Sequence, residues 1–289
     1  MESFSWDSSE TVKRQPIAQW YRCSPRFDQH GNGWCGACYL VSAVQLIEDR
    51  WNLLVARQFP KTSKPPRGLV ATLSIQAALD HYDADAAASE EAGWNGCHGG
   101  DPLDVLRCFV NDGRLCRPER RTGVREWLGH VQAAALGTPR ADEARFRVTR
   151  AYRVAPESVK EEIMTNGTVG LCVNGDLIAS TDANGVVPMS AALDAALYAD
   201  DHAVCVVGWH GAYWLVRNSW GARRPAASPT DVSCASRGAN ECSTTAAEWS
   251  SVDGKPGFCF LPMAHPPLSF DGEQSPWFAA TVAPKGPKT

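Results

Sequence analysis

Three residues that lie far apart in the sequence have the types that nucleophilic catalysis by a thiol requires. Cys38 ends the glycine-rich segment 31–38, His202 precedes a run of apolar residues, and Asn218 follows another such run. A cysteine becomes a strong nucleophile when a histidine takes its proton, and a third polar group can hold the histidine ring in one tautomer. The three residue types therefore predict attack by a thiolate on a carbonyl carbon, provided that the fold brings them together.

A helix is predicted to begin at or just after Cys38. Its apolar side chains recur at helical spacing over residues 38–51, with Glu48 and Arg50 on the other side. These apolar residues are Leu40, Val44, Ile47 and Trp51. The free amides and the dipole at a helix N-terminus lower the pKa of a thiol, so this placement suits a nucleophile.

Strands are predicted to carry the other two residues. Four short segments are rich in β-branched and aromatic residues, namely 169–173, 203–209, 212–217 and 257–262. His202 would begin one strand and Asn218 would end the next, so the two side chains can lie side by side. Asn218 could then hold the imidazole while His202 forms an ion pair with Cys38.

The order of the elements indicates an α+β protein with two lobes. Two more helices are predicted, at 102–111, with Pro102 in its first turn, and at 157–165. Helices come first and strands follow, which differs from an alternating βαβ sheet. The long loop 222–254 is rich in Ala, Ser and Thr, and the five prolines after residue 264 predict an extended or poorly ordered tail.

Composition excludes several classes of protein. The 289 residues carry a formal net charge of -4, which argues against a nucleic-acid partner. No apolar stretch reaches the roughly 18 residues that span a bilayer. The first residues are polar and resemble no secretory signal, so we expect a matured enzyme, a module released from a larger precursor or polyprotein, or an intracellular protein.

Eleven cysteines favour an oxidising compartment, such as a secreted, vacuolar or lysosomal one, although an intracellular location stays open. Ten of them could pair and leave one free thiol. The local pairs Cys108–Cys116 and Cys234–Cys242 are tentative predictions. Cys172 and Cys205 fall on strands expected to be neighbours and could be core thiols.

Four motifs in one order resemble the papain and cathepsin type of cysteine protease. Cys35-Gly36-Ala37-Cys38-Tyr39 is similar to that family's nucleophile signature. Asn218-Ser219-Trp220-Gly221 resembles its asparagine motif, and Gly96-Cys97-His98-Gly99-Gly100 resembles a stretch that borders its substrate cleft. His202 supplies the fourth. The resemblance covers residues 1 to about 261.

This resemblance implies the papain-like two-lobed fold, with the active site in the cleft between a helical lobe and a β-barrel-like lobe. The helical lobe would span roughly 24–125 and the β lobe roughly 140–263, with 222–254 as an inserted loop. The catalytic domain would then be 1–263, and 264–289 would be a proline-rich tail.

The resemblance also implies site roles. It pairs Cys35 with Cys97, makes Trp220 a shield for Asn218, and places Gly99 and Gly100 against the substrate backbone. The pocket for the residue two places before the scissile bond would contain Pro102, Cys172, Asp200 and Ala203. Asp101 and Asp200 suggest a mild preference for a basic side chain there.

The oxyanion hole departs from the family pattern. The family usually has a glutamine six residues before its nucleophile, and that position is Asn32 here. Gln29 lies three residues further upstream and could serve if the loop bulges. Asn32 is favoured at this point because it requires the smaller movement of the loop.

The predicted activity is endopeptidase hydrolysis of protein or peptide substrates through a thioester, with no metal or organic cofactor. Alternatives for Cys35 and Cys38 are a redox pair or half of a zinc site, but neither a preceding βαβ strand nor a second ligand pair of matching spacing supports them. A papain fold that only binds, and an acyltransferase that uses the same site, are the two other functions considered.

Overall fold

The fold is that of a computed structural model, which describes residues 2–24, 27–29, 35–64, 66, 69–75, 78, 79, 97, 99–112, 146–182, 185–188, 201–220, 257–263 and 275–285. Its described elements combine helices with one antiparallel sheet, so the predicted α+β class is confirmed. No helix among these residues is long and apolar enough to cross a membrane.

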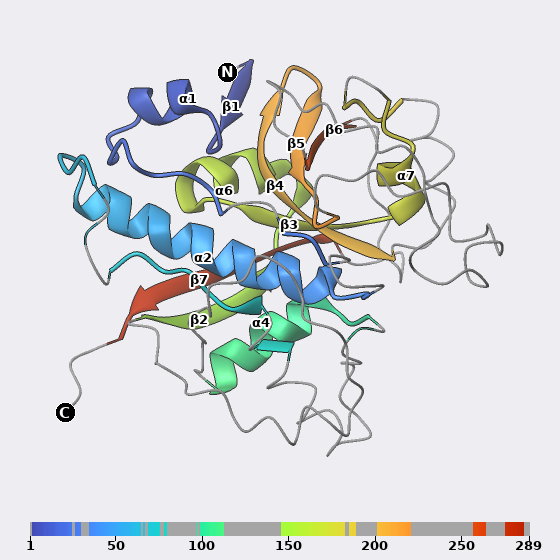
Figure 1. Ribbon diagram of the computed structural model, residues 1–289, viewed down its shortest axis with the longest axis horizontal. Coiled ribbons are helices and arrows are strands. Elements are labelled where there is room, and N and C mark those ends of the chain that lie inside the picture. Colours follow the sequence, from blue (N-terminus) through green and yellow to red (C-terminus); the bar gives the residue numbers. More distant parts are fainter. Residues whose placement is uncertain are drawn as a thin grey trace, which may run out of the picture.

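The long helix α2, Cys38–Gln58, runs across the middle of the molecule (Figure 1). It begins at the residue that the sequence predicts. Nearly all its side chains are buried, including Glu48 and Arg50, so the prediction that these two lie on a polar face is wrong. The reason is that α4 and β7 pack against one part of α2 and strands β3 and β4 against another.

Four shorter helices complete the described helical part. α4 is Pro102–Asp112 and α6 is Val159–Asn166, preceded by the 3-10 turn Pro156–Ser158, as the sequence predicts for these two helices. α1 is Ser9–Arg14, and α7 is Gly175–Ala179. A polar side chain caps each of α1 and α7: Ser8 accepts from the amide of Thr11 and Asn174 from that of Asp176.

The sheet has the strand order β2-β7-β3-β4-β5-β6, and β1 pairs with β4 outside this path. Every neighbouring pair is antiparallel. The strands are β1 Ser3–Ser5, β2 Phe146–Arg153, β3 Val169–Val173, β4 His202–His210, β5 Tyr213–Arg217, β6 Phe258–Pro262 and β7 Trp277–Pro284. The four strands expected from the sequence are confirmed to within one residue at each end.

The prediction of a proline-rich tail outside the catalytic domain is wrong for β7. This strand pairs with β2 along its length and with β3 at Gly170 and Leu171, so it lies inside the sheet (Figure 1). Its signal was weak because small alanines and two flanking prolines hide the alternation of apolar residues. Gly170 is needed for the contact, since a Cβ there would stand 2.0 Å from the Phe278 ring.

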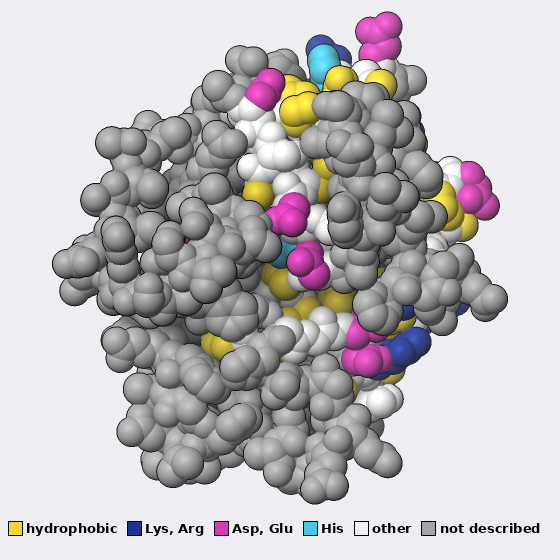
Figure 2. Space-filling view, turned by 90° about the vertical axis from the view of Figure 1, so that its right-hand side faces the viewer, with side chains coloured by type: hydrophobic (Ala, Val, Ile, Leu, Met, Phe, Trp, Pro, Cys, Tyr) yellow, Lys and Arg dark blue, Asp and Glu magenta, His cyan; other side chains and the backbone are white. Residues whose placement is uncertain are grey.

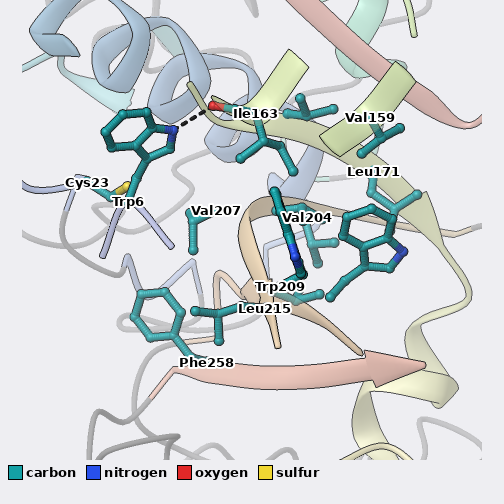
Figure 3. Close-up of a cluster of buried hydrophobic side chains, with 14 of the residues drawn as sticks. Trp6, Cys23, Val159, Ile163, Leu171, Val204, Val207, Trp209, Leu215 and Phe258 are labelled. Carbon is teal, nitrogen blue, oxygen red and sulfur yellow. Dashed lines mark hydrogen bonds between the residues drawn. The ribbon is translucent and has the colours of Figure 1, made fainter. Parts of the chain in front are cut away.

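Two apolar cores flank this framework, and α2 contributes to both. One lies between the sheet and α6, where the Trp6 indole donates a hydrogen bond of 2.6 Å to the Ile163 carbonyl (Figure 3). The other joins α2, α4, β2 and β7, and contains Leu106 and Phe278. Because both cores hold α2, the first residue of this helix, Cys38, is rigidly placed relative to β4.

Removal of residues 264–289 should therefore prevent stable folding. β7 buries Trp277, Phe278 and Val282, and burying a large apolar side chain contributes about 1.5–3 kcal/mol. Their sum, with the lost ladder hydrogen bonds, is of the order of a domain's whole stability, about 5–15 kcal/mol. Thermal unfolding followed by near-ultraviolet circular dichroism measures the effect, and we expect no cooperative transition.

A chain that ends at Lys285 is the matched control for this deletion, because it keeps all of β7. It should unfold at the temperature of the full chain. A cooperative transition within a few degrees of the full chain after the longer deletion would contradict the structural role of β7.

Candidate active site

Cys38 occupies the first residue of α2 and is 8% exposed. The first turn of this helix contains no acidic residue, so no side chain there opposes its positive end. The loop before it is fixed by the Cys35–Cys97 disulfide, which the family resemblance implies and the structure contains. The Gly36 amide also donates to the Cys97 carbonyl at 2.6 Å.

The surroundings of the Cys38 thiol place it beside β4. Burial raises its pKa, the backbone of Ala203 and of Tyr39 acts in the opposite direction, and the charge of Asp201 adds to the rise. Ala203 and Asp201 are the two chain neighbours of His202. The thiol therefore lies beside the backbone of β4 at Ala203, the residue that follows His202. Burial favours the neutral form of the thiol unless a positive partner is present.

His202 and Asn218 lie where the sequence predicts, at the start of β4 and directly after β5. The Nε2 atom of His202 is 2.8 Å from Oδ1 of Asn218. The amide of Ser219 donates to this same oxygen at 2.8 Å, which identifies it as the acceptor. Nε2 must then carry a hydrogen, and Nδ1 is left as the basic nitrogen of the neutral ring.

Trp220 lies against the ring of His202; its shielding of Asn218 stays a prediction. Its ring stacks on His202 with a centroid distance of 4.4 Å and an interplanar angle of 26°. A ring stacked on an imidazole reduces its contact with water, and a hydrogen bond in such a less polar environment is stronger. Asp201 also has a structural role, because its Oδ1 accepts a hydrogen bond of 2.6 Å from the amide of Gly175.

Gln29 also contacts the residues around Asn218, although its spacing from Cys38 made it the second choice, after Asn32, for the oxyanion hole. Its backbone amide donates to the Ser219 carbonyl at 2.9 Å, and its Oε1 accepts from the Ser219 hydroxyl at 2.5 Å. Its Nε2 donates to the Cys35 carbonyl at 2.8 Å. A carboxamide nitrogen carries two hydrogens, so a second N–H can be donated beside the nucleophile's loop. Asn32 lies outside the described residues.

Several predicted cleft residues come from the elements around Cys38. Gly99 and Gly100 precede α4, and Pro102 begins it. Cys172 of β3 stands opposite Ala203 of β4 in the antiparallel register, so their side chains share one face of the sheet.

Asp101 has a structural use that the sequence does not indicate. Its Oδ1 accepts from the amide of Leu103 at 2.7 Å and so caps α4. Its proposed partner in basic-residue preference, Asp200, is outside the described residues. The same is true of Cys116, Cys234 and Cys242, so the two local disulfide predictions stay predictions. On the face of the molecule shown in Figure 2, the acidic side chains that are described are scattered rather than gathered in one patch.

No cluster of three or more His, Cys, Asp or Glu side chains that could hold a metal ion occurs among the described residues. Cys35 is committed to its disulfide rather than to a zinc or dithiol pair with Cys38.

A buried charged group behind the site was missed at the sequence level. Glu48 accepts hydrogen bonds of 2.6 Å from the Ser24 hydroxyl and from the Leu73 amide. Burial, above all, raises its pKa from the model-compound value of 4.5 to about 7, and the neighbouring Asp49 adds to this while Arg217 opposes it. Three consecutive charged residues, Glu48, Asp49 and Arg50, were the feature of the sequence that could have indicated a charged group in the core.

Glu48 should make the protein more stable in acid than at neutral pH. A pKa raised in the folded state gives stability that is complete below the unfolded value and is lost as pH rises through the folded value. A rise from 4.5 to about 7 corresponds to roughly 3 kcal/mol of stability, lost between those two pH values. We expect Glu48→Gln to flatten the dependence of the unfolding temperature on pH in this window.

Glu162→Gln is a control of opposite sign. Arg50 lies 2.8 Å from Glu162, and this charge together with hydrogen bonds lowers the Glu162 pKa despite partial burial. The stabilising contribution of Glu162 is lost as pH falls. Glu162→Gln should therefore keep the loss of stability between pH 4.5 and about 7 that we assign to Glu48. Unfolding temperatures of both variants between pH 4 and 8 measure the two effects, and an unchanged slope in Glu48→Gln would contradict the assignment.

Comparisons with known proteins relate this chain to cysteine proteases. A family model described as papain family cysteine protease matches residues 23–246. The cathepsin B-like cysteine proteinase 5 of Caenorhabditis elegans is 26% identical over 276 residues, covering 82% of this chain and 72% of its own length. A gut-specific cysteine proteinase of the same animal is 24% identical over 230 residues, covering 70% of this chain and 62% of its own length.

Solved structures share the fold. The bromelain protease from Ananas comosus, solved in complex with the E64 inhibitor, superimposes with a TM-score of 0.53 at 17% identity. The alignment covers 97% of this chain and 99% of that one.

Proposed function

Because this chain belongs to the papain family of cysteine proteases, we propose that Cys38, His202 and Asn218 carry out its peptide hydrolysis through a thioester. The observation that carries this proposal is the 2.8 Å contact between His202 Nε2 and Asn218 Oδ1, with the Cys38 thiol beside the two neighbours of His202. Proteins or peptides are the substrates that membership of this family implies.

The first step is formation of an ion pair. Burial alone keeps the Cys38 thiol protonated, and the backbone contacts that act in the other direction do not fully offset it. Transfer of the thiol proton to Nδ1 of His202 makes an imidazolium beside a thiolate, so each charge compensates the other. Asn218 accepts from Nε2–H in both states and keeps the ring in place during the transfer.

The thiolate then attacks the carbonyl carbon of the scissile peptide. Negative charge moves to the carbonyl oxygen, and donors about 3 Å from its new position stabilise it. The backbone N–H of Cys38, at the start of α2, is one donor. We assign the second to Nε2 of Gln29 rather than to Asn32, because Ser219 and the Cys35 carbonyl hold the Gln29 carboxamide beside this loop.

Breakdown of the tetrahedral species expels the amine, which takes the proton from His202. Water, deprotonated by His202, then attacks the thioester and releases the acid and the free thiol. The disulfide and the family's cysteine chemistry support a secreted, vacuolar or lysosomal setting, where oxidised cysteines persist.

Labelling with a thiol-directed epoxide tests this function against that of a silent binding module. The Cys38 sulfur should open the epoxide ring, with the released alkoxide taking a proton, and mass mapping should find a single rapid adduct. His202→Ala should slow labelling by roughly 10²–10⁴, the usual contribution of one acid–base group. Wild-type labelling no faster than that of an exposed cysteine peptide would support the binding module instead.

A further inference from the structure

A fully buried ion pair includes the residue that immediately precedes Asn218. Nη2 of Arg217 lies 2.9 Å from Oδ2 of Asp49, and both side chains have no exposed surface. Asp49 belongs to α2, whose first residue is Cys38, and Arg217 ends β5 and immediately precedes Asn218. The pair thus joins the two elements that carry the nucleophile and the orienting asparagine.

Both partners are fixed by further contacts. Asp49 accepts from the Ser24 amide at 2.5 Å through Oδ1 and from the Thr168 hydroxyl at 2.6 Å through Oδ2. Nη1 of Arg217 donates to the Ser24 carbonyl at 3.0 Å. The carboxylate of Asp49 and the guanidinium of Arg217 therefore both bind the backbone of Ser24, one at its amide and the other at its carbonyl.

Asn218 connects the ion pair to His202, because it follows Arg217 in the chain and contacts the His202 ring. Its amide donates to the Gly257 carbonyl at 3.0 Å, and its side chain meets His202 and Ser219. None of these contacts joins β5 to α2. The Asp49–Arg217 pair joins these two elements, at the residue just before Asn218.

We propose that Asp49 and Arg217 are positioning residues for catalysis, which set the place of the Asn218 carboxamide, and through it the His202 ring, relative to Cys38 on α2. The proposal rests on the proposed function of these three residues. A loss of catalytic geometry of the order of 1 Å can cost about 10²-fold in rate, so the pair should affect turnover without touching the substrate.

The charged and titratable groups around the pair do not replace it. Glu48, on α2, accepts hydrogen bonds from Ser24 and Leu73. The thiols of Cys205, on β4, and of Cys23, in the segment before α2, are close enough to affect the charge of Arg217. Burial raises the pKa of both thiols, so each is neutral below alkaline pH. Asp49 is accordingly the one carboxylate in contact with Arg217 among the described ion pairs.

The test uses a variant that removes both charges together, Asp49→Asn with Arg217→Gln, because removing one would leave the other buried and unpaired. We expect kcat to fall roughly 10- to 100-fold with KM changed less than about threefold. The rate of Cys38 alkylation by iodoacetamide should be measured against pH. In the wild type an ion-paired thiolate should keep this rate constant down to acidic pH, which we call the acid plateau. The variant should lose this plateau, since a misplaced imidazolium no longer stabilises the thiolate. Arg217→Lys keeps the charge and should retain most of the wild-type rate.

A double-mutant comparison isolates the route through Asn218. In an Asn218→Ala background, the loss of the ion pair should cost no more than about twofold, because there is no carboxamide left to position. A double variant with a lower unfolding temperature but wild-type kcat and wild-type alkylation profile would overturn the proposal. So would fully additive losses with Asn218→Ala. Failure of the proposed function would instead appear in the wild type itself, as absent cleavage and no acid plateau.

Discussion

Cys38→Ala is expected to abolish peptide cleavage, with kcat reduced by roughly 10⁴–10⁶, the range seen when an enzyme loses its nucleophile. Alanine leaves the helix start and the packing nearly unchanged, because the residue is small, buried and at the first position of α2. The loss would therefore be chemical rather than structural. Steady-state cleavage of a peptide library by wild type and variant measures it, and the cleaved sequences report the substrate preference.

Two other cysteine variants are the controls for this experiment. Cys259→Ala removes a fully buried thiol of β6, whose pKa burial raises to about 12, and should leave cleavage unchanged. Cys35→Ala breaks the disulfide and should lower stability by about 2–4 kcal/mol while Cys38 stays reactive. Cleavage that survives in Cys38→Ala, or thiol reactivity that vanishes in Cys35→Ala at unchanged stability, would contradict the assigned roles.

Gln29→Ala is expected to lower kcat by roughly 10²–10³, the usual cost of one oxyanion donor, while Asn32→Ala should cost far less. The ranking reverses the one from spacing, because the structure buries the Gln29 side chain between Ser219 and the Cys35 carbonyl. The measurement is kcat on one peptide substrate for both variants.

Alkylation of Cys38 by iodoacetamide separates an oxyanion role from a folding defect. That reaction places no charge on a carbonyl oxygen, so its rate should be the same in Gln29→Ala and in wild type. A slower alkylation would mean that Gln29 acts on the thiol or on the fold. A larger loss of kcat in Asn32→Ala would restore the spacing argument.

Much of the site could be predicted from the sequence because its parts are local. Cys38 at a helix start and His202 and Asn218 at strand ends follow from short apolar runs, and these runs became α2, β4 and β5. The placement of each residue depends on neighbours within a few positions, where periodicity is informative.

What could not be predicted depends on contacts between distant segments. The sequence of β7 alternates too little between apolar and polar residues to be recognised as a strand by itself. It forms a strand because it pairs with β2 and β3. Glu48 and Arg50 look like a polar face until the packing of α2 on both cores is known. The Gln29 carboxamide is placed by Ser219, a partner far along the chain that spacing cannot reveal.

The position of β7 between β2 and β3 also has a consequence for synthesis on the ribosome. β7 is the last described element to be translated, yet its partner β2 precedes it with β3, β4, β5 and β6 in between. Such non-local pairing raises contact order and slows folding. The nascent chain can form α2 and the β4–β5 hairpin early, but the edge of β2 and that of β3 wait unpaired until β7 emerges. Chaperone binding to these edges, and the release of a competent protease only after translation of β7, follow from the strand order.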